Sequence, residues 1–429
     1  MNGSGNNLSK CEHRRLFHLT WIVMVGLALL LGLLGASGVL SAQDRVLRPV
    51  RAQSGGKPQG PVPSGTRAGW RVLEPVRYEH LSVFPVVARE GFDTSAFLTL
   101  DEGLASGQVV VTEQGGEMIR RTRDGREVRV PQGGASVNQL VLINRSGRPL
   151  VLLAGEVVTG GKQDRVIGKD RIVPPGAEPL PLDVFCVEHG RWSAGSQFTA
   201  AKLMVHPSVR EKAAVEQKQD EVWAAVRSGT TARVASDAAA PAPPLSGRTL
   251  ARTVETEAPT QSYAGIYNKS HVGQSAESFA AEVERRFARA TRELKGEHVI
   301  GVVVAYGGEV AWADAFASPE LFSLYWPKLL RSYVVEAMSV PVEEYGRASV
   351  ADAERFLGEQ QGRQIIEVEP GEYRLVQIES PRYNIFQLAS LTERSEPLLH
   401  FNKLRKEGVR SGKWVPPVED VQPMIRHRD

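Results

Sequence analysis

The chain has 429 residues, of which 42% are hydrophobic and 24% are charged, a composition typical of globular proteins with about two or three domains. Its formal net charge is +3, and the acids and bases are interleaved along the chain. This argues against a nucleic-acid partner, because a domain that neutralises phosphates carries a basic face or stripe.

An apolar segment lies near the start of the chain. Residues 16–42 contain no Asp, Glu, Lys or Arg, and three basic residues precede them closely. About 20 apolar residues span a bilayer, and flanking cations stay in the cytoplasm, so the pattern predicts a membrane partner and an exported remainder. Residues 1–42 are either a cleaved signal peptide or a retained signal anchor, which predicts a periplasmic, extracellular or membrane-anchored protein. Cleavage would leave Cys186 without a disulfide partner.

Residues 43–70 are rich in Gly, Pro, Ser and Gln and predict a flexible linker. Residues 71–232 predict a β-rich lobe that ends in a helix at 199–227. Short apolar runs bounded by turn residues indicate strands at 81–88, 109–112, 125–131, 140–143, 150–154 and 182–187. The prolines of residues 168–181 predict a loop without a regular ladder.

Residues 233–274 are dominated by Ala, Pro, Thr and Ser at their centre and predict a linker or long loop. Residues 275–410 predict a second lobe, and 411–429 a C-terminal tail. In the second lobe, helices are expected from Ser275 and at 319–338 and 351–358, with strands at 299–305, 309–316, 365–368, 373–379, 385–388 and 398–402. Without a steady βαβα alternation, this order predicts the α+β class: a β-rich N-terminal lobe followed by a mixed α+β lobe.

Two predicted strands end in carboxylates with basic residues close behind. Glu156 follows the run at 150–154, and Glu188 follows the run at 182–187. Burial of an unpaired carboxylate shifts its pKa by up to roughly 3 to 5 units, so such groups are normally paired, hydrogen-bonded or functional. We predict Glu156 and Glu188 as the candidate catalytic acid and base. The alternative is that Arg165 or Arg191 pairs with them to satisfy the core.

Polar residues near these carboxylates suit a small anionic or sugar-like ligand. Two glycines could form a backbone nest for an anion, and a tryptophan could stack on a sugar or base or cap the core. The predicted ligand-binding residues are Gly160, Gly161, Lys162, Gln163, Asp164, Arg165, Arg191 and Trp192.

Common catalytic and cofactor motifs are missing from the sequence. The phosphate-loop pattern fails at Glu156 and Gln163, and no Gly-x-Ser-x-Gly, His-Glu-x-x-His, Cys-x-x-Cys, EF-hand or Gly-x-Gly-x-x-Gly motif occurs. We therefore predict neither a cofactor nor a metal. Cys186 reads as a small buried hydrophobe. In the second lobe, the positions expected to serve packing and solvated charge are Asp314, Lys328, Arg331 and Tyr333.

Three sequence strings carry a family resemblance. They are LLAGEVVTGGKQDR at 152–165, the two prolines at 174–175, and CVEHGRW at 186–192. They resemble an uncharacterised domain family, the ADP-ribosylglycohydrolase and rhodanese-phosphatase-superfamily-associated proteins. The resemblance extends upstream through 100–104 and more loosely into 312–331. It implies a tie to NAD or ADP-ribose metabolism, although an exported protein would also meet extracytoplasmic sugars, nucleotides and envelope components.

Two functional hypotheses follow. In the first, the exported chain binds, and in a second step hydrolyses, a small polar ligand through the carboxylate, Arg and Lys groups. In the second, it is a non-catalytic structural or interaction protein of the cell envelope whose charges form an internal brace. The sequence does not decide whether the protein is an enzyme, and it leaves the oligomeric state open.

Overall fold

The computed structural model describes residues 69–113, 117–121, 127–131, 139–188, 195–228, 262–269, 271–339, 346–406 and 424–425. All of them belong to one contact unit, Val62–Arg426. The predicted leader at 1–42 lies outside the described residues, as do most of the two predicted linkers and the tail. The boundaries predicted between lobes therefore stay predictions.

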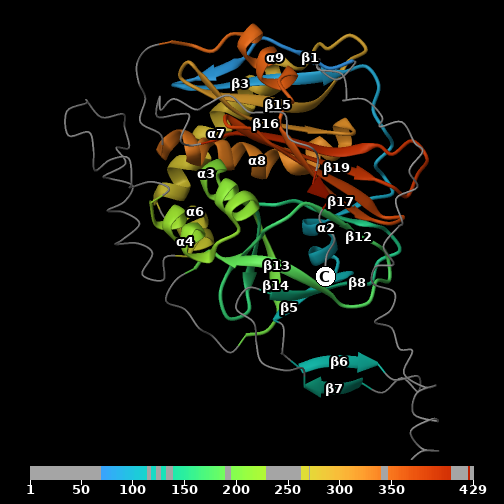
Figure 1. The fold of residues 1–429 in the computed structure, drawn as a ribbon. Helices are drawn as coiled ribbons and strands as arrows, with labels where there is room; N and C mark the ends of the chain where they lie inside the picture. The colour runs from blue at the N-terminus through green and yellow to red at the C-terminus, as the bar shows by residue number, and fades with distance from the viewer. Residues whose placement is uncertain are drawn as a thin grey trace, which may run out of the picture. The chain divides into compact units, whose positions relative to one another are not determined.

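A ten-stranded sheet dominates the unit (Figure 1). Its neighbours in order are β1 (Arg71–Val72), β3 (Leu81–Ala88), β15 (His298–Tyr306), β16 (Glu309–Phe316), β20 (Leu398–Arg405), β19 (Tyr383–Ser390), β18 (Tyr373–Glu379), β17 (Arg363–Glu369) and β21 (Met424–Ile425), with β2 (Val76–Tyr78) on β3. The pairs are antiparallel except β17 with β21. Strands near both ends of the described chain thus share one sheet.

Both faces of this sheet are covered, which explains the near-continuous apolar run of β15. Successive side chains of a strand point to opposite faces. Val302 and Val304 belong to the core shared with helices α7 (His271–Ala290) and α8 (Pro319–Ser339), whereas Val303 belongs to the core under α9 (Val350–Gly358). Figure 1 shows α9 on one face and α7 and α8 on the other.

Most of the 152–165 string lies in a second, six-stranded sheet, to which residues 156–160 and Arg165 belong. Its order is β14 (Phe198–Met204), β10 (Glu156–Gly160), β11 (Arg165–Ile167), β13 (Leu180–Cys186), β8 (Gln139–Asn144) and β5 (Val109–Glu113). A three-stranded sheet joins β12 (Arg171–Val173), β9 (Leu150–Leu152) and β4 (Leu98–Thr99), and β6 (Glu117–Arg121) pairs with β7 (Glu127–Pro131).

Short helices complete the fold around these strands. They are α2 (Leu100–Ala105), α3 (Pro207–Glu211), the π-helix η1 (Lys212–Glu216), α4 (Gln219–Ser228) and α6 (Tyr263–Lys269). Helix α2 starts with a capping box, in which Thr99 and Glu102 satisfy each other's backbone N–H groups. In the part of the chain described here, no helix is both long and apolar enough to cross a bilayer.

The predicted α+β class is confirmed, with a β-rich N-terminal half and longer helices in the C-terminal half. Two local predictions are wrong. The helix expected from residue 199 begins as strand β14, because pairing with β10 overrides its helix-compatible composition. The 168–181 loop contains β12, which pairs with β9 directly before the first proline of that segment.

Candidate functional site

Glu156, the predicted catalytic residue at the start of β10, forms a buried ion pair with Lys328. Its side chain is 2% exposed. Lys328 Nζ donates to Oε1 at 2.5 Å, and the Leu153 N–H donates to Oε2 at 2.8 Å. Lys328 also donates to Asp101 at 2.9 Å. Burial raises the pKa of Glu156, and the charge of Lys328 partly offsets that rise. The contacts brace the 152–165 string against α8.

The predicted ligand-binding residues from Gly160 to Arg165 form the β10–β11 hairpin. Gly160 and Gly161 have φ angles of +120° and +51°, which favour glycine. The Gly160 N–H donates to Asp164 at 3.1 Å, and the Lys162 N–H donates to Glu113 at 2.7 Å. The Gly161 N–H donates to the Gln197 carbonyl at 2.9 Å, so these backbone donors all bind acceptors of the protein itself.

Arg165 lies beneath this turn and is fully buried. One guanidinium nitrogen donates to the Gln163 carbonyl at 2.7 Å, and another lies 3.8 Å from Glu113. Nε and the second terminal nitrogen have no hydrogen-bond partner among the described residues. An unsatisfied buried donor is energetically costly, so an acceptor at these nitrogens would be stabilised. The ligand-binding role of Arg165 stays a prediction.

Glu188 accepts from the Asp164 N–H at 3.0 Å, close to the tip of the same hairpin. Glu156 and Gly160 are the two ends of β10, and four residues of a strand span about 13 Å. The two predicted carboxylates therefore belong to different clusters. Arg191 and Trp192 lie outside the described residues, so their role stays a prediction.

Cys186 is a fully buried cysteine on β13. Burial raises the pKa of its thiol to about 11, so it is protonated at neutral pH. This agrees with its predicted role as a small buried hydrophobe.

Asp314, which the sequence predicts to serve packing or solvated charge, is the centre of a buried polar cluster. Arg210 donates to it at 3.0 Å, His400 Nε2 lies 2.9 Å away, and the Trp312 indole N–H donates at 2.6 Å. The hydroxyl of Tyr333 and the amide of Asn402 also donate to it. Burial opposes ionisation, but Arg210 and His400 outweigh it and bring the pKa of Asp314 to about 2.

His400 joins this cluster to the segment that follows the 152–165 string. Its Nδ1 lies 2.7 Å from Asp170 and its Nε2 faces Asp314. Burial lowers the pKa of His400, yet the two carboxylates outweigh burial and raise it. Asp170 in turn accepts from the Ala154 N–H at 2.7 Å. We define Asp170, Arg210, Asp314 and His400 as the buried tetrad, in which Arg210 and His400 face the two carboxyl groups.

A small cavity of about 90 Å³ lies over Asp170. Two residues near this cavity have a positive φ: Gly155 at +97°, which glycine adopts freely, with the Arg210 side chain against it, and Gln217 at +52°, at the end of the π-helix. A π-helix and a left-handed non-glycine residue are both found more often near functional sites. The cavity suits water or a group of a few atoms. Lys169 and Glu367, which form an ion pair, also line it.

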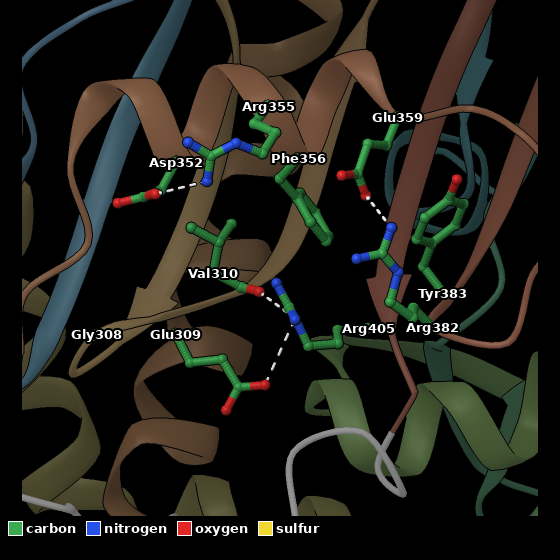
Figure 2. Close-up of a pocket in the computed structure, with 10 residues that line it drawn as sticks. All are labelled: Gly308, Glu309, Val310, Asp352, Arg355, Phe356, Glu359, Arg382, Tyr383 and Arg405. Atoms are coloured by element: carbon green, nitrogen blue, oxygen red, sulfur yellow. Dashed lines mark hydrogen bonds and ion pairs between the residues drawn. The ribbon is translucent and has the colours of Figure 1, made fainter. Parts of the chain in front are cut away.

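A larger cavity of about 320 Å³ lies on the face of the ten-stranded sheet that carries α9 (Figure 2). We call it the arginine cavity, because Arg355, Arg382 and Arg405 line it. Each has a carboxylate partner: Arg355 lies 2.9 Å from Asp352, Arg382 lies 3.3 Å from Glu359, and Arg405 lies 3.4 Å from Glu309. Its other lining residues are Gly308, Val310, Phe356 and Tyr383.

The positions of these groups explain what the sequence analysis missed. Asp170 and His400 are 230 positions apart, so no local spacing connects them. Asp314 did leave a signal, because it is the single charged residue within the apolar run 310–316 of β16. The arginine cavity draws on a helix and several strand ends and has no local signature. Within the described ranges, no group of His, Cys, Asp and Glu has a metal-binding arrangement.

A family model describes this chain: the ARG and Rhodanese-Phosphatase-superfamily-associated Protein domain matches residues 69–400. The chain belongs to this family. The match covers the buried tetrad and both large sheets up to His400, and the rest of β20 and strand β21 lie beyond it. Comparisons with curated proteins and with solved structures found no match.

Proposed function

We propose that this protein binds a small polar anion in the arginine cavity. The observation that supports the proposal is the presence of three guanidinium groups around one hollow of about 320 Å³. Ligand pockets range from about 300 to 1,000 Å³, and arginine binds carboxylates and phosphates through two parallel N–H groups. The ligand class is therefore a small molecule that carries a phosphate or a carboxylate.

The existing ion pairs are weak enough to be exchanged. The side chains of Arg355 and Arg382 are 64% and 59% exposed. Exposed ion pairs contribute about 0 to 1 kcal/mol, because water screens them. A guanidinium carries five N–H donors, more than one carboxylate accepts. An incoming anion thus displaces these contacts, or adds to them, at little cost.

The family name extends the proposal. Read as ADP-ribosylglycohydrolase, its first word favours a ribose phosphate or ADP-ribose as the anion. The predicted export favours extracytoplasmic sugars and nucleotides instead. Both sources present a phosphate group, so phosphate recognition is the shared chemistry. Hydrolysis at Glu156 or Glu188 remains a separate proposal, since neither carboxylate lines the arginine cavity or the cavity over Asp170.

Calorimetric titration tests the proposal with inorganic phosphate, ribose 5-phosphate, ribose and ADP-ribose. We expect the phosphate-bearing probes to bind and ribose not to bind. The double variant Arg355→Gln with Arg382→Gln should weaken binding by about ten-fold or more, because hydrogen bonds to charged groups contribute about 1.5 to 3 kcal/mol. The matched control is Arg374→Gln, which breaks the exposed pair with Glu396 outside the cavity. Equal affinity of the double variant and this control would refute the proposal.

The alternative function, a non-catalytic structural or interaction protein, has one observation in its favour. Glu156 binds Lys328, and the members of the buried tetrad bind one another inside the protein. Such groups form the internal brace that this alternative requires. Absence of binding for every anion in the titration, with a normally folded chain, would favour it.

A further inference from the structure

The walls of the arginine cavity carry as many carboxylate groups as guanidinium groups. Beside the three arginines, Glu309, Asp352 and Glu359 line the hollow, so the formal charges of its walls cancel. Each carboxylate lies 2.9 to 3.4 Å from the arginine that it pairs with. An anion that approaches an arginine therefore also approaches a carboxylate, which repels it. A ligand that carries only negative charge gains less from these walls than one that also carries a positive group.

Glu309 keeps acceptor capacity toward the cavity. Its contact with Arg405 joins Oε1 to Nε at 3.4 Å, but the N–H of that Nε donates to the Val310 carbonyl at 2.7 Å. Figure 2 draws both contacts. At this nitrogen, Arg405 therefore attracts Glu309 by charge rather than by a hydrogen bond. An ionised carboxylate has about four lone-pair sites, and the side chain of Glu309 is 37% exposed in the cavity wall. A donor group of a ligand can thus reach this carboxylate.

Asp352 provides the contrast, because the start of α9 uses its acceptors. The Ser349 N–H and hydroxyl donate to Oδ2 at 3.0 and 2.7 Å, and the paired arginine donates to Oδ1 at 2.9 Å. Asp352 and Ser349 form the capping box of this helix. Glu359 is intermediate, since Arg382 donates to it at 3.3 Å. Among the carboxylates that line the cavity, Glu309 is therefore the first candidate to bind a donor group of the ligand.

We propose that the ligand of the arginine cavity carries a primary ammonium group as well as its anionic group, and that Glu309 binds the ammonium. The inference rests on the proposed function, in which Arg355 and Arg382 bind the anionic end. Such a ligand forms a new ion pair for each one that it displaces, because its anion replaces a carboxylate at the arginines and its ammonium replaces a guanidinium at Glu309. An ammonium group has three N–H donors, which suit the acceptors of a carboxylate. The class includes amino acids and amino-bearing phosphate esters, which fit a hollow of about 320 Å³.

Calorimetric titration of the full chain with two matched pairs of probes tests the inference. The phosphate pair is phosphoethanolamine and ethyl phosphate, and the carboxylate pair is β-alanine and propionate. The members of each pair differ in one ammonium group. At about pH 8, the amine is charged and the phosphate carries most of its second negative charge. We expect the amino-bearing member of at least one pair to bind about five-fold more tightly than its partner, the gain that one partly exposed ion pair can provide.

The variant Glu309→Gln separates the ammonium contact from the anion contact. The change keeps an acceptor oxygen and removes the negative charge. Ethyl phosphate should bind this variant a few-fold more tightly than the wild type, since a repelling carboxylate is gone, whereas phosphoethanolamine should lose its advantage over ethyl phosphate. The matched control is Glu396→Gln, which removes an exposed carboxylate that pairs with Arg374 outside the cavity. This control should keep the preference for the amino-bearing probe.

The inference and the proposed function fail in different ways. Equal affinities within both pairs, with binding lost in the Arg355→Gln, Arg382→Gln double variant, would overturn the ammonium contact and leave anion binding intact. A preference that survives in Glu309→Gln would overturn the role of Glu309. Tighter binding of ribose 5-phosphate than of phosphoethanolamine would also overturn the inference, because the carboxylates would then recognise neutral hydroxyl groups. Absence of binding for every probe would overturn both the inference and the proposed function.

Discussion

The buried tetrad and the arginine cavity use the same kinds of charged side chain in opposite settings. In the tetrad, Asp314 and His400 are 0% exposed, and five neighbouring side chains bind the carboxylate of Asp314. In the cavity, Arg355 and Arg382 are mostly exposed, and each has one carboxylate partner. Buried charged groups with several partners hold segments of the chain together. Exposed arginines with a single partner can exchange that partner for a ligand.

The two regions are therefore expected to have different roles. The tetrad connects residues before β12 with α3, β16 and β20, which lie far apart in the sequence. Substitutions there should act on folding stability. Substitutions in the arginine cavity should act on anion binding with little change in stability.

The largest expected effect is that of Asp314→Asn. The change leaves Arg210 and His400 buried without their shared anion, and loss of one partner from a buried ion pair costs about 3 to 5 kcal/mol. Urea unfolding followed by circular dichroism should show this loss in the free energy of unfolding. Glu309→Gln, which removes the exposed partner of Arg405, is the control and should change stability by less than about 1 kcal/mol. Equal effects of the two substitutions would contradict the comparison.

The next effect is that of Glu156→Gln. Lys328 keeps Asp101 as a partner, so we expect a smaller loss, about 1 to 3 kcal/mol, from an incompletely paired buried cation. The same variant tests the predicted catalytic role of Glu156. If Glu156 instead acts on a ligand, unfolding should be nearly unchanged while ligand binding is lost.

Glu188→Gln is the companion variant, because Glu188 accepts from the Asp164 N–H in the other cluster. A glutamine can still accept that hydrogen bond through its carbonyl oxygen. Its stability loss should therefore be smaller than that of Glu156→Gln. A larger loss would show that the charge of Glu188 stabilises the hairpin.

The sequence predicted the strands better than the contacts between them. Apolar runs such as residues 302–305 mark a strand whatever its partner, and the α+β class follows from such runs. The strand β14 was missed, because pairing with β10 decides its structure. The tetrad needed knowledge of which strands are neighbours: β16 and β20 pair with Asp314 opposite Asn402 and Phe316 opposite His400. Only the isolated aspartate in an apolar run was visible beforehand.

The acid limb of the stability curve tests the pKa of Asp314. The pKa of Asp314 falls from the usual 3.8 to about 2 in the folded chain. A lowered pKa contributes stability above pH 3.8, and this contribution is lost as the pH falls through about 2. The shift corresponds to about 2 kcal/mol. Unfolding free energies of the wild type and Asp314→Asn should converge by about this amount between pH 4 and pH 2, and parallel curves would contradict the pKa.

The smallest change in stability belongs to Glu309→Gln, and it is the most direct test of the arginine cavity. Removing this carboxylate releases Arg405 from its exposed partner and makes the net charge of the cavity walls more positive by one unit. Inorganic phosphate should therefore bind a few-fold more tightly, and the gain should shrink as salt screens the added charge. Calorimetric titration at low and high salt measures both quantities. A weaker affinity in this variant would mean that Glu309 positions Arg405 for the anion rather than competing with it.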